Sequence, residues 1–293
     1  MSHLNPVSIP PARIVILGSG GFIGGAIMRK LGATGSSVIG LGRKELDLLA
    51  DDGERRLGSL LRSDDALVIV SARAPCKTHA MMLENIHMMA SVCEALAKQT
   101  VAHLVYISSD AVYADGPVPL TESSPAAPTT LHGAMHLARE QMLLASAGAT
   151  PAAILRPTLV YGSGDPHNGY GPNRFRRQAN RGEAIVLFGG GEERRDHVDV
   201  DDVAEIVRLV LYHRSAGVLN IATGSVVTFR ALADKAVALS AHKVEIRSSP
   251  RSGPMPHNGY RPFDPSATLR AFPAFHYTTV DEGLARAQQR EFG

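Results

Sequence analysis

Two histidines one helical turn apart are the residues whose types and spacing point most directly to chemistry. His132 and His136 enclose the run Gly133-Ala134-Met135, so on a helix their rings share one face. An imidazole has an ordinary pKa of about 6.5, which lets it take up or release a proton near neutral pH. The pair is therefore a candidate for acid/base catalysis.

The same spacing is found in zinc sites, where two histidines on one helical face bind the ion. A catalytic zinc needs a third protein ligand, and the sequence near His132 and His136 offers none. The acidic run Asp199 to Asp202 is interpreted as the first turn of a helix, where the helix dipole favours carboxylates. We therefore expect no metal site.

A glycine-rich loop follows a predicted strand and opens a predicted helix, as a dinucleotide-binding fingerprint requires. In this setting Gly18 permits a tight turn, Gly21 a close approach of the backbone to pyrophosphate, and Gly24 close packing of helix on strand. Free N–H groups at the start of the helix bind the phosphates. The predicted cofactor-binding residues of the loop are Gly18, Gly20, Gly21, Phe22, Ile23 and Gly24. The alternative is a glycine-rich turn without a ligand.

The end of the second predicted strand carries two cations where an NAD enzyme normally carries an acid. This position holds Gly42-Arg43-Lys44, and an acid there would hydrogen-bond the ribose 2′-hydroxyl of NAD. Arg43 can bind a 2′-phosphate through two N–H groups. The sequence therefore favours NADP over NAD, unless both cations are simply solvated.

These residues need a scaffold, and the apolar pattern indicates which one. Short apolar runs alternate with segments of helical length and periodicity, which is typical of βαβ units. Predicted buried strands are Ile14–Leu17, Val38–Leu41, Leu67–Val70, Leu104–Ile107 and Ala153–Leu155, and predicted helices are Gly24–Leu31, Met81–Ala97 and Leu131–Leu144. The expected fold is α/β, a doubly wound parallel (Rossmann) sheet whose ligands bind at the carboxyl ends of the strands.

The pattern changes after Tyr161, and we expect a smaller, interleaved C-terminal substrate lobe. The remaining predicted elements are helices over Asn173–Arg181, Asp199–Tyr212, Phe229–Ser240 and Val280–Gln289, and a strand over Val218–Ile221. Residues 1–162 and about 197–222 are assigned to the dinucleotide-binding body. Residues of about 163–196 and 223–293 are assigned to the lobe.

Composition excludes several classes of protein. The chain has 293 residues, of which 44% are hydrophobic and 20% charged, with a formal charge of +2. Such a chain buries a large core and offers no broad basic face for nucleic acid. Cys76 and Cys93 form no CxxC or disulfide framework, and no apolar stretch is long enough to span a membrane. We therefore expect a soluble, cytoplasmic protein without membrane or nucleic-acid partners.

Several further motifs give the chain a marked resemblance to the extended short-chain dehydrogenase/reductases of the NAD-dependent epimerase/dehydratase family. Besides the glycine loop, these are Ser71-Ala72, Asn85, Ser108–Tyr113, Arg156–Gly162 and Arg194–Ala204. The resemblance spans nearly the whole chain. Members of this family mostly act on nucleotide-linked sugars.

The resemblance also gives the histidines a context. In the family, a Ser or Thr and a Tyr-x-x-x-Lys pair carry out the proton chemistry beside the nicotinamide. Ser109 matches the family serine, while His132 stands in place of the tyrosine and His136 in place of the lysine. The interpretations are catalysis with His132 as acid/base and His136 orienting it or holding the ribose, a lost or altered reaction, or histidines that merely fill the core.

Other roles follow from the resemblance alone. Further residues that match the family's cofactor contacts are Asp47, Leu48, Ser71, Ala72, Arg73, His136 and Pro157. Residues that match its substrate contacts are Asp110, Asn173, Arg195 and Arg261, with Arg195 and Arg261 as clamps for a diphosphate. A solvated basic face is the alternative for the arginines. Ala111 replaces the glutamate that the family's dehydratases use as a base, which disfavours dehydration.

The sequence therefore predicts an NADP-dependent oxidoreductase, with NAD as a second cofactor, that reduces a 4-keto nucleotide sugar. A C4 epimerase is one alternative, and a family member that binds cofactor but has lost or altered its activity is another. The expected partners are a nucleotide sugar and a second copy of the chain. Met81, Met82, Met88 and Met89 could line such a homodimer interface or belong to the core.

Overall fold

A computed structural model describes residues 1–293, and its centre is a seven-stranded sheet. Six strands are parallel, and the short β1 (Ser2–His3) pairs antiparallel with the last of them. In spatial order the parallel strands are β10 (Ser215–Ile221), β6 (Ala152–Pro157), β5 (His103–Ile107), β4 (Asp65–Ile69), β2 (Arg13–Leu17) and β3 (Val38–Leu41). The order reverses between β2 and β4, so the predicted doubly wound sheet is confirmed.

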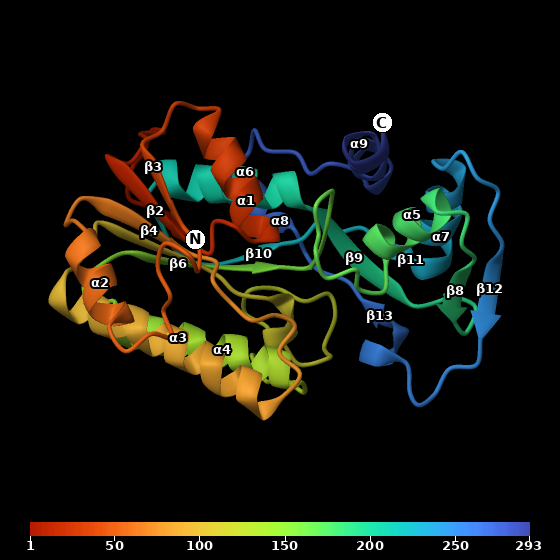
Figure 1. The fold of residues 1–293 in the computed structure, drawn as a ribbon, viewed down its shortest axis with the longest axis horizontal. Helices are drawn as coiled ribbons and strands as arrows, with labels where there is room; N and C mark the ends of the chain where they lie inside the picture. The colour runs from red at the N-terminus through yellow and green to blue at the C-terminus, as the bar shows by residue number, and fades with distance from the viewer.

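Helices cover both faces of this sheet (Figure 1). One layer holds α1 (Phe22–Gly32), α6 (Val200–Tyr212) and the short α8 (Ser266–Ala271). The other holds α2 (Gly53–Leu60), α3 (His79–Lys98) and α4 (Leu131–Ser146). Because both faces are covered, every residue of β4 and β5 is buried, which explains why these strands appear in the sequence as continuous apolar runs.

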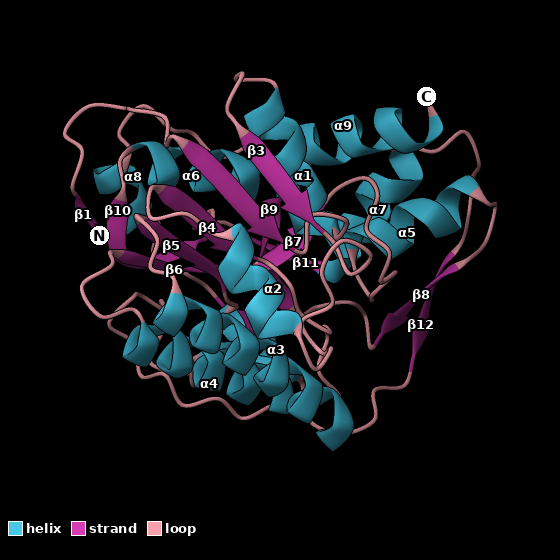
Figure 2. Cartoon of the chain, turned by 60° about the vertical axis from the view of Figure 1, so that its left-hand side comes forward, coloured by secondary structure: helices cyan, strands magenta, loops and turns pink.

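A second group of elements lies beside the carboxyl ends of the strands. Its helices are α5 (Pro172–Asn180), α7 (Phe229–Ala238) and α9 (Val280–Phe292). Its strands are β7 (Leu159–Tyr161), β8 (Ile185–Phe188), β9 (Arg194–Asp199), β11 (Val226–Thr228), β12 (Ile246–Ser249) and β13 (Tyr260–Arg261). Strands β8 and β12 pair with each other away from the main sheet (Figure 2). The short 3-10 helices η1 (Asp110–Val112) and η2 (Pro256–Gly259) complete the fold.

Each region has its own core. The second group packs around Phe175, Phe229 and Leu232, which are nearly or fully buried. The chain then returns to the main body, because Phe272 and Phe275 pack with the layer formed by α1 and α6. The lobe is thus interleaved with the sheet, while the residue boundaries of the two parts remain a prediction.

The long predicted elements are confirmed, with ends shifted by a few residues. Asp199 is the N-cap of α6 and accepts the Asp201 N–H at 2.8 Å, as the acidic run predicts. Helix α2 and the short strands outside the main sheet were not predicted. No helix has the length and apolar composition needed to cross the membrane, and both cysteines are free thiols.

A buried histidine at the start of β5 makes stability depend on pH. His103 Nε2 lies 2.8 Å from the Ser215 carbonyl oxygen, and its Nδ1 is buried without a partner. Burial lowers the pKa of His103 to about 4. The folded protein therefore binds fewer protons than the unfolded chain in mildly acidic solution, and stability is lost as the pH falls from about 6.5 to about 4.

We expect the stability advantage of the wild type over a His103→Phe variant to shrink by about 3 kcal/mol between pH 7 and pH 4. Urea unfolding at several pH values measures it. The exposed His242 supplies the control, since the difference between wild type and His242→Gln should stay nearly constant. A constant difference for His103→Phe would show that His103 titrates alike in both states.

Candidate active site

A cavity of about 650 Å³ opens at the carboxyl ends of the parallel strands, where a doubly wound sheet binds its ligands. The segments that follow β2, β3, β4, β5 and β6 all contribute to its wall, and the loop before α5 closes the far side. The predicted site residues that line it are Gly18, Gly21, Phe22, Ile23, Gly24, Arg43, Asp47, Leu48, Ser71, Ala72, Arg73, Ser109, Asp110, His132, His136, Pro157, Asn173 and Arg195. Gly20 and Arg261 are not part of the wall.

The glycine loop adopts the geometry that its sequence predicts. Gly18 has a φ of 87°, in the region that favours glycine, and a Cβ there would lie 2.7 Å from the Ser71 nitrogen. A Cβ on Gly24 would lie 2.1 Å from the Gly18 carbonyl oxygen. The turn and the close packing of α1 on the loop therefore both depend on missing side chains, as the sequence predicts.

Unpaired hydrogen-bonding groups at this loop fit a dinucleotide. The N-cap of α1 is Gly21, which provides no side-chain cap, so the N–H groups of Phe22 and Ile23 have no protein acceptor. The Ser71 Oγ is buried in the wall without a partner. Donors aimed into a cavity at a helix N-terminus are suited to phosphate oxygens. The residues present therefore fit a bound NAD(P), whose position remains a prediction.

Arg43 lies at the rim of the cavity, with its side chain 77% exposed. Its Nε donates to Asp47 Oδ2 at 3.1 Å, and its two terminal nitrogens have no protein partner. Hydrogen bonding to the Leu49 N–H, together with Arg43, lowers the pKa of Asp47. Glu45 folds back to accept the Gly42 N–H at 2.9 Å, which places a second carboxylate beside this rim. The rim thus holds a free guanidinium end flanked by two acids.

His132 lies half-buried in the cavity wall on the first turn of α4. Its Nδ1 accepts the Cys76 N–H at 3.3 Å, which favours the tautomer that carries the proton on Nε2. Burial lowers the pKa of His132, while the charge of Asp110 opposes this shift. His132 is therefore a neutral imidazole whose Nε2 has no protein partner.

His136 is buried one turn further along α4 and also lines the cavity. The rings of His132 and His136 meet edge to face, with centroids 4.7 Å apart. His136 Nδ1 lies 2.8 Å from the Tyr106 hydroxyl, and burial, then His132 and Arg139, lowers the pKa of His136 well below its ordinary value. The helix therefore places both imidazoles on one face, as the spacing predicts.

Ser109 makes only local hydrogen bonds in this wall. Its Oγ accepts the Ala111 N–H at 3.2 Å and donates to Asp110 Oδ1 at 3.4 Å. It therefore caps η1. No hydrogen bond joins Ser109 to His132, although both line the same cavity. A role for Ser109 in catalysis stays a prediction.

Asp110 links two of the predicted substrate-binding arginines. Arg195 lies 3.8 Å from its Oδ2, and Arg261 Nε lies 3.3 Å from the same oxygen. Arg261 is almost fully buried, and its terminal nitrogens bond to Asp115, His257 and backbone carbonyls. Its donors are therefore all used inside the protein, whereas Arg195 faces the cavity. A diphosphate contact fits Arg195 better than Arg261.

Asn173, in the first turn of α5, holds the loop that precedes this helix. Its Oδ1 accepts the Gly162 N–H at 3.0 Å, and its Nδ2 donates to Asp165 Oδ2 at 2.9 Å. Both groups belong to the segment between β7 and α5, and Asp165 lines the cavity. Asn173 thereby shapes this wall, and its contact with substrate stays a prediction.

Three buried side chains at this site were not predicted from the sequence. Tyr106 lies under α4, and Arg139 is buried with its guanidinium 5.2 Å from the Tyr106 ring centroid. His197 lines the cavity with Nδ1 3.1 Å from the Arg195 carbonyl oxygen and Nε2 buried without a partner, and burial lowers its pKa to about 3. In the sequence these residues are marked only as polar side chains within apolar runs. That pattern does not show which groups they contact.

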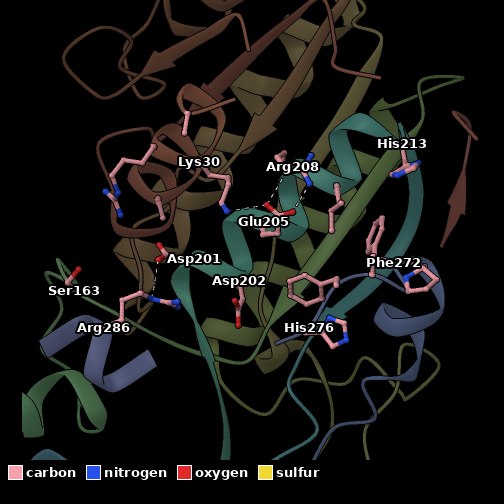
Figure 3. A pocket seen from close by; sticks show the side chains of 18 of the residues that line it. Lys30, Ser163, Asp201, Asp202, Glu205, Arg208, His213, Phe272, His276 and Arg286 are labelled. Carbon is pink, nitrogen blue, oxygen red and sulfur yellow. Dashed lines mark hydrogen bonds and ion pairs between the residues drawn. The ribbon is translucent and has the colours of Figure 1, made fainter. Parts of the chain in front are cut away.

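A larger hollow of about 1580 Å³ lies along the later turns of α1, between α6, α9 and the segment after α8. Several of its charged groups pair with one another, since Glu205 pairs with both Lys30 and Arg208, and Arg286 pairs with Asp201 (Figure 3). Neither the glycine loop nor the histidine pair reaches it. No group of three or more His, Cys, Asp or Glu side chains is arranged to hold a metal ion anywhere in the chain.

Comparison with known proteins places this geometry among enzymes of one family. The sequence model described as "NAD dependent epimerase/dehydratase family" matches residues 14–222. A dTDP-6-deoxy-L-talose 4-dehydrogenase (NAD(P)(+)) of Kitasatospora kifunensis is 31% identical over 264 residues, which cover 82% of this chain and 83% of the relative. A putative GDP-L-fucose synthase 2 of Oryza sativa subsp. japonica is 29% identical, with coverage of 76% and 71%.

Solved structures share the fold. UDP-glucose 4-epimerase of Thermus thermophilus, in complex with NAD, superposes with a TM-score of 0.82 at 23% identity, over 94% of this chain and 98% of that one. UDP-glucose 4-epimerase of Thermotoga maritima, with UDP-glucose, gives a TM-score of 0.83 at 23% identity, with coverage of 94% and 97%. At this identity the likeness concerns the fold alone.

Proposed function

Because the chain belongs to the NAD-dependent epimerase/dehydratase family, we propose that it is an NADP-dependent oxidoreductase that reduces a 4-keto nucleotide sugar. One observation carries this proposal: a single cavity joins the glycine loop, the histidine pair and the Asp110–Arg195 pair. The first set fits a dinucleotide, the second fits proton transfer, and the third fits an anionic substrate. A reductase needs these three elements around one space.

The proposed roles follow from the positions in the wall. The cofactor, when bound, supplies the hydride that reaches the sugar carbonyl carbon. Ser109 polarises the carbonyl oxygen, and the histidine pair carries the acid/base chemistry, with His132 in contact with that oxygen. Arg195 binds the diphosphate of the sugar nucleotide, because a planar guanidinium can bind two phosphate oxygens at once.

The relatives indicate which substrates to test first. Similar proteins include a dTDP-6-deoxy-L-talose 4-dehydrogenase, GDP-L-fucose synthases and a dTDP-L-rhamnose 4-epimerase. The last of these supports C4 epimerisation as the second candidate. An epimerase would convert the sugar without net consumption of cofactor, whereas a reductase consumes one NADPH per product.

We expect the purified chain to oxidise dTDP-6-deoxy-L-talose or GDP-L-fucose with NADP⁺ and to reduce the 4-keto product with NADPH. We expect His132→Phe to lower kcat by about 100-fold or more, because losing one hydrogen-bond donor to the developing oxyanion costs about 10²- to 10³-fold. Absorbance of NADPH and chromatography of the sugar nucleotides measure both. Exposed His242 gives the control variant, His242→Gln, which should keep its rate.

The outcomes separate the candidates. Interconversion of dTDP-L-rhamnose with its C4 epimer at constant NADPH identifies an epimerase. A chain that binds NADPH but changes no sugar nucleotide has lost or altered the family's reaction. Full activity in His132→Phe shows that His132 does not stabilise the carbonyl oxygen.

The cofactor preference is tested at Arg43. We expect NADPH to bind about tenfold more tightly than NADH, with Arg43→Ala removing most of this preference, because a guanidinium bound to a phosphate contributes about 1.5 kcal/mol or more. Fluorescence titration with each cofactor measures the ratio. Arg55→Ala is the control, since Arg55 is 70% exposed and pairs with Asp52 outside the cavity. Equal affinities in the wild type would show that Glu45 and Asp47 outweigh Arg43.

We also propose a cytoplasmic homodimer that associates through α3 and α4. Met88 and Met89 are buried in the core, so they cannot line the interface. The exposed apolar residues on these two helices are Leu83, Leu131 and Leu144. Packing of two copies through these helices would cover large apolar side chains that are otherwise exposed.

A further inference from the structure

A buried tyrosine connects the histidine pair to the interior of the protein. Tyr106 lies on β5 under α4, fully enclosed, and its hydroxyl oxygen lies 2.8 Å from His136 Nδ1. No other hydrogen-bond partner of that hydroxyl exists in the protein. A neutral phenol carries one proton to donate, so the simplest assignment has Tyr106 donating to Nδ1 and His136 carrying its own proton on Nε2.

The Nε2 atom of His136 lies on the cavity side of the Tyr106–His136 pair. It has no hydrogen-bond partner in the protein and is not fully enclosed by protein atoms. The His136 ring also lines the cavity. A proton leaving Nε2 can therefore be replaced at Nδ1 from Tyr106 in one concerted movement. His136 never needs to become a cation, which its buried position disfavours.

Arg139 supplies the charge that such a movement requires. Its guanidinium is fully buried and has no carboxylate partner, and it bonds instead to the Ser71 carbonyl at 2.7 Å and to Asn85 Oδ1 at 3.4 Å. It lies 5.2 Å from the Tyr106 ring centroid. A buried cation without an anion is costly, and loss of the Tyr106 proton would give it one.

The neighbouring carboxylate is already engaged. Glu140, on the same helix, pairs with Arg156 and accepts the Ser108 hydroxyl, so it neither takes the Tyr106 proton nor neutralises Arg139. Burial raises the pKa of Tyr106 to about 12, an effect that Arg139 opposes and Glu140 supports. A phenol of this strength holds its proton at neutral pH and still gives it to a sugar alkoxide, which is the stronger base.

His132 has no comparable supply. Its Nδ1 accepts a backbone N–H from Cys76, and an amide does not give up its proton. His132 can donate a hydrogen bond from Nε2, but no group at its Nδ1 can replace a proton that leaves Nε2. The two imidazoles therefore differ in what lies at their Nδ1 atoms.

We propose that Tyr106, backed by Arg139, is the proton reservoir of this site and delivers its proton to the substrate oxygen through His136. The proposal rests on the proposed reduction. As a hydride from a reduced nicotinamide reaches the carbonyl carbon, the carbonyl π bond becomes an alkoxide lone pair. That oxygen takes the His136 Nε2 proton, and Nδ1 takes the Tyr106 proton. The products are a sugar hydroxyl, a neutral His136 with its proton on Nδ1, and a Tyr106 phenolate beside Arg139. After the product is released, water in the cavity returns a proton to His136 Nε2, and the Nδ1 proton moves back to Tyr106.

The first test needs no turnover. In the whole chain labelled with ¹⁵N-histidine at pH 7, we expect the His136 nitrogens to report a single Nε2–H tautomer, with the resonances assigned by their loss in His136→Gln. Tyr106→Phe should replace this signature by a mixture of tautomers. Tyr212→Phe is the matched control, since it removes another core tyrosine hydroxyl, bonded to Ser36 and Thr34 outside the cavity.

The second test measures the reaction. We expect Tyr106→Phe to lower kcat for NADPH-dependent reduction by about 100-fold, the contribution typical of a positioned proton donor. The sugar-nucleotide KM and the NADPH Kd should stay within about twofold, since neither ligand touches Tyr106, and Tyr212→Phe should keep all three values. A loss of folding alone would instead change the Kd.

The outcomes are distinct. A wild-type chain that reduces no sugar nucleotide overturns the proposed function and the chemical role of the relay with it. An active wild type with an equally active Tyr106→Phe variant overturns the relay and leaves the function standing. A His136 that carries its proton on Nδ1 in the wild type also overturns the relay, whatever the activity.

Discussion

Replacing Gly24 by alanine is expected to weaken NADP(H) binding by about 100-fold or more, a loss of about 3 kcal/mol. The new Cβ would lie 2.1 Å from the Gly18 carbonyl oxygen and 2.9 Å from its carbonyl carbon. Both are backbone atoms, so α1 and the loop must separate. The N–H groups of Phe22 and Ile23 then no longer converge on one phosphate position. Calorimetric or fluorescence titration with NADPH measures the affinity.

Gly25, the next residue, provides the control. A Cβ at Gly25 would lie 3.6 Å from Arg29 Nη1 and 3.7 Å from the Ser19 carbonyl oxygen, which are ordinary contacts. Gly25→Ala should therefore bind NADPH normally and gain about 0.5–1 kcal/mol of stability from the helix. If Gly24→Ala binds as tightly as Gly25→Ala, the loop is not the phosphate site.

Replacing Glu140 by glutamine is expected to destabilise the protein by about 3–5 kcal/mol, because it leaves a buried cation without its partner. Glu140 and Arg156 form a buried pair with two contacts, of which Arg156 Nε to Glu140 Oε1 is 3.0 Å. Their side chains are only 1% and 7% exposed. Glutamine keeps the shape and loses the charge. Urea unfolding measures the free energy.

The exposed ion pair of Arg230 and Asp234 is the control for the effect of burial on stability. Both side chains are 53% exposed, so Asp234→Asn should change stability by less than about 1 kcal/mol. A similarly small change for Glu140→Gln would mean that water reaches Arg156 in the folded protein. The pair also matters for the site, since it fastens α4, which carries both histidines, to β6.

Much of the fold could be predicted from the sequence because its signals are local. The continuous apolar run of β4 and the glycine loop before α1 depend on neighbours in the chain, and the structure confirms both. The resemblance to the NAD-dependent epimerase/dehydratase family is confirmed as well. The motifs that carry it are likewise short runs of consecutive residues.

The predictions were weaker where a side chain depends on distant partners. The sequence predicts a diphosphate contact for Arg261, yet its donors meet Asp110 and Asp115, which precede it by 151 and 146 residues, and the nearby His257. Tyr106 was regarded only as part of an apolar strand. The hydrogen-bond partners of Arg261 and Tyr106 cannot be deduced from residue type, because the partners that decide their roles come from other elements.

The sequence by itself determined the alternation of strands and helices, the phosphate-type loop and the shared helical face of His132 and His136. Only the tertiary structure decided which groups lie at the Nδ1 atoms of those imidazoles. Packing α4 against β5 places the Tyr106 hydroxyl at His136 Nδ1, and the loop after β4 brings the Cys76 N–H to His132 Nδ1. Tautomers follow from hydrogen-bond partners across these contacts, and such partners are set by the packing of segments that are remote in the chain.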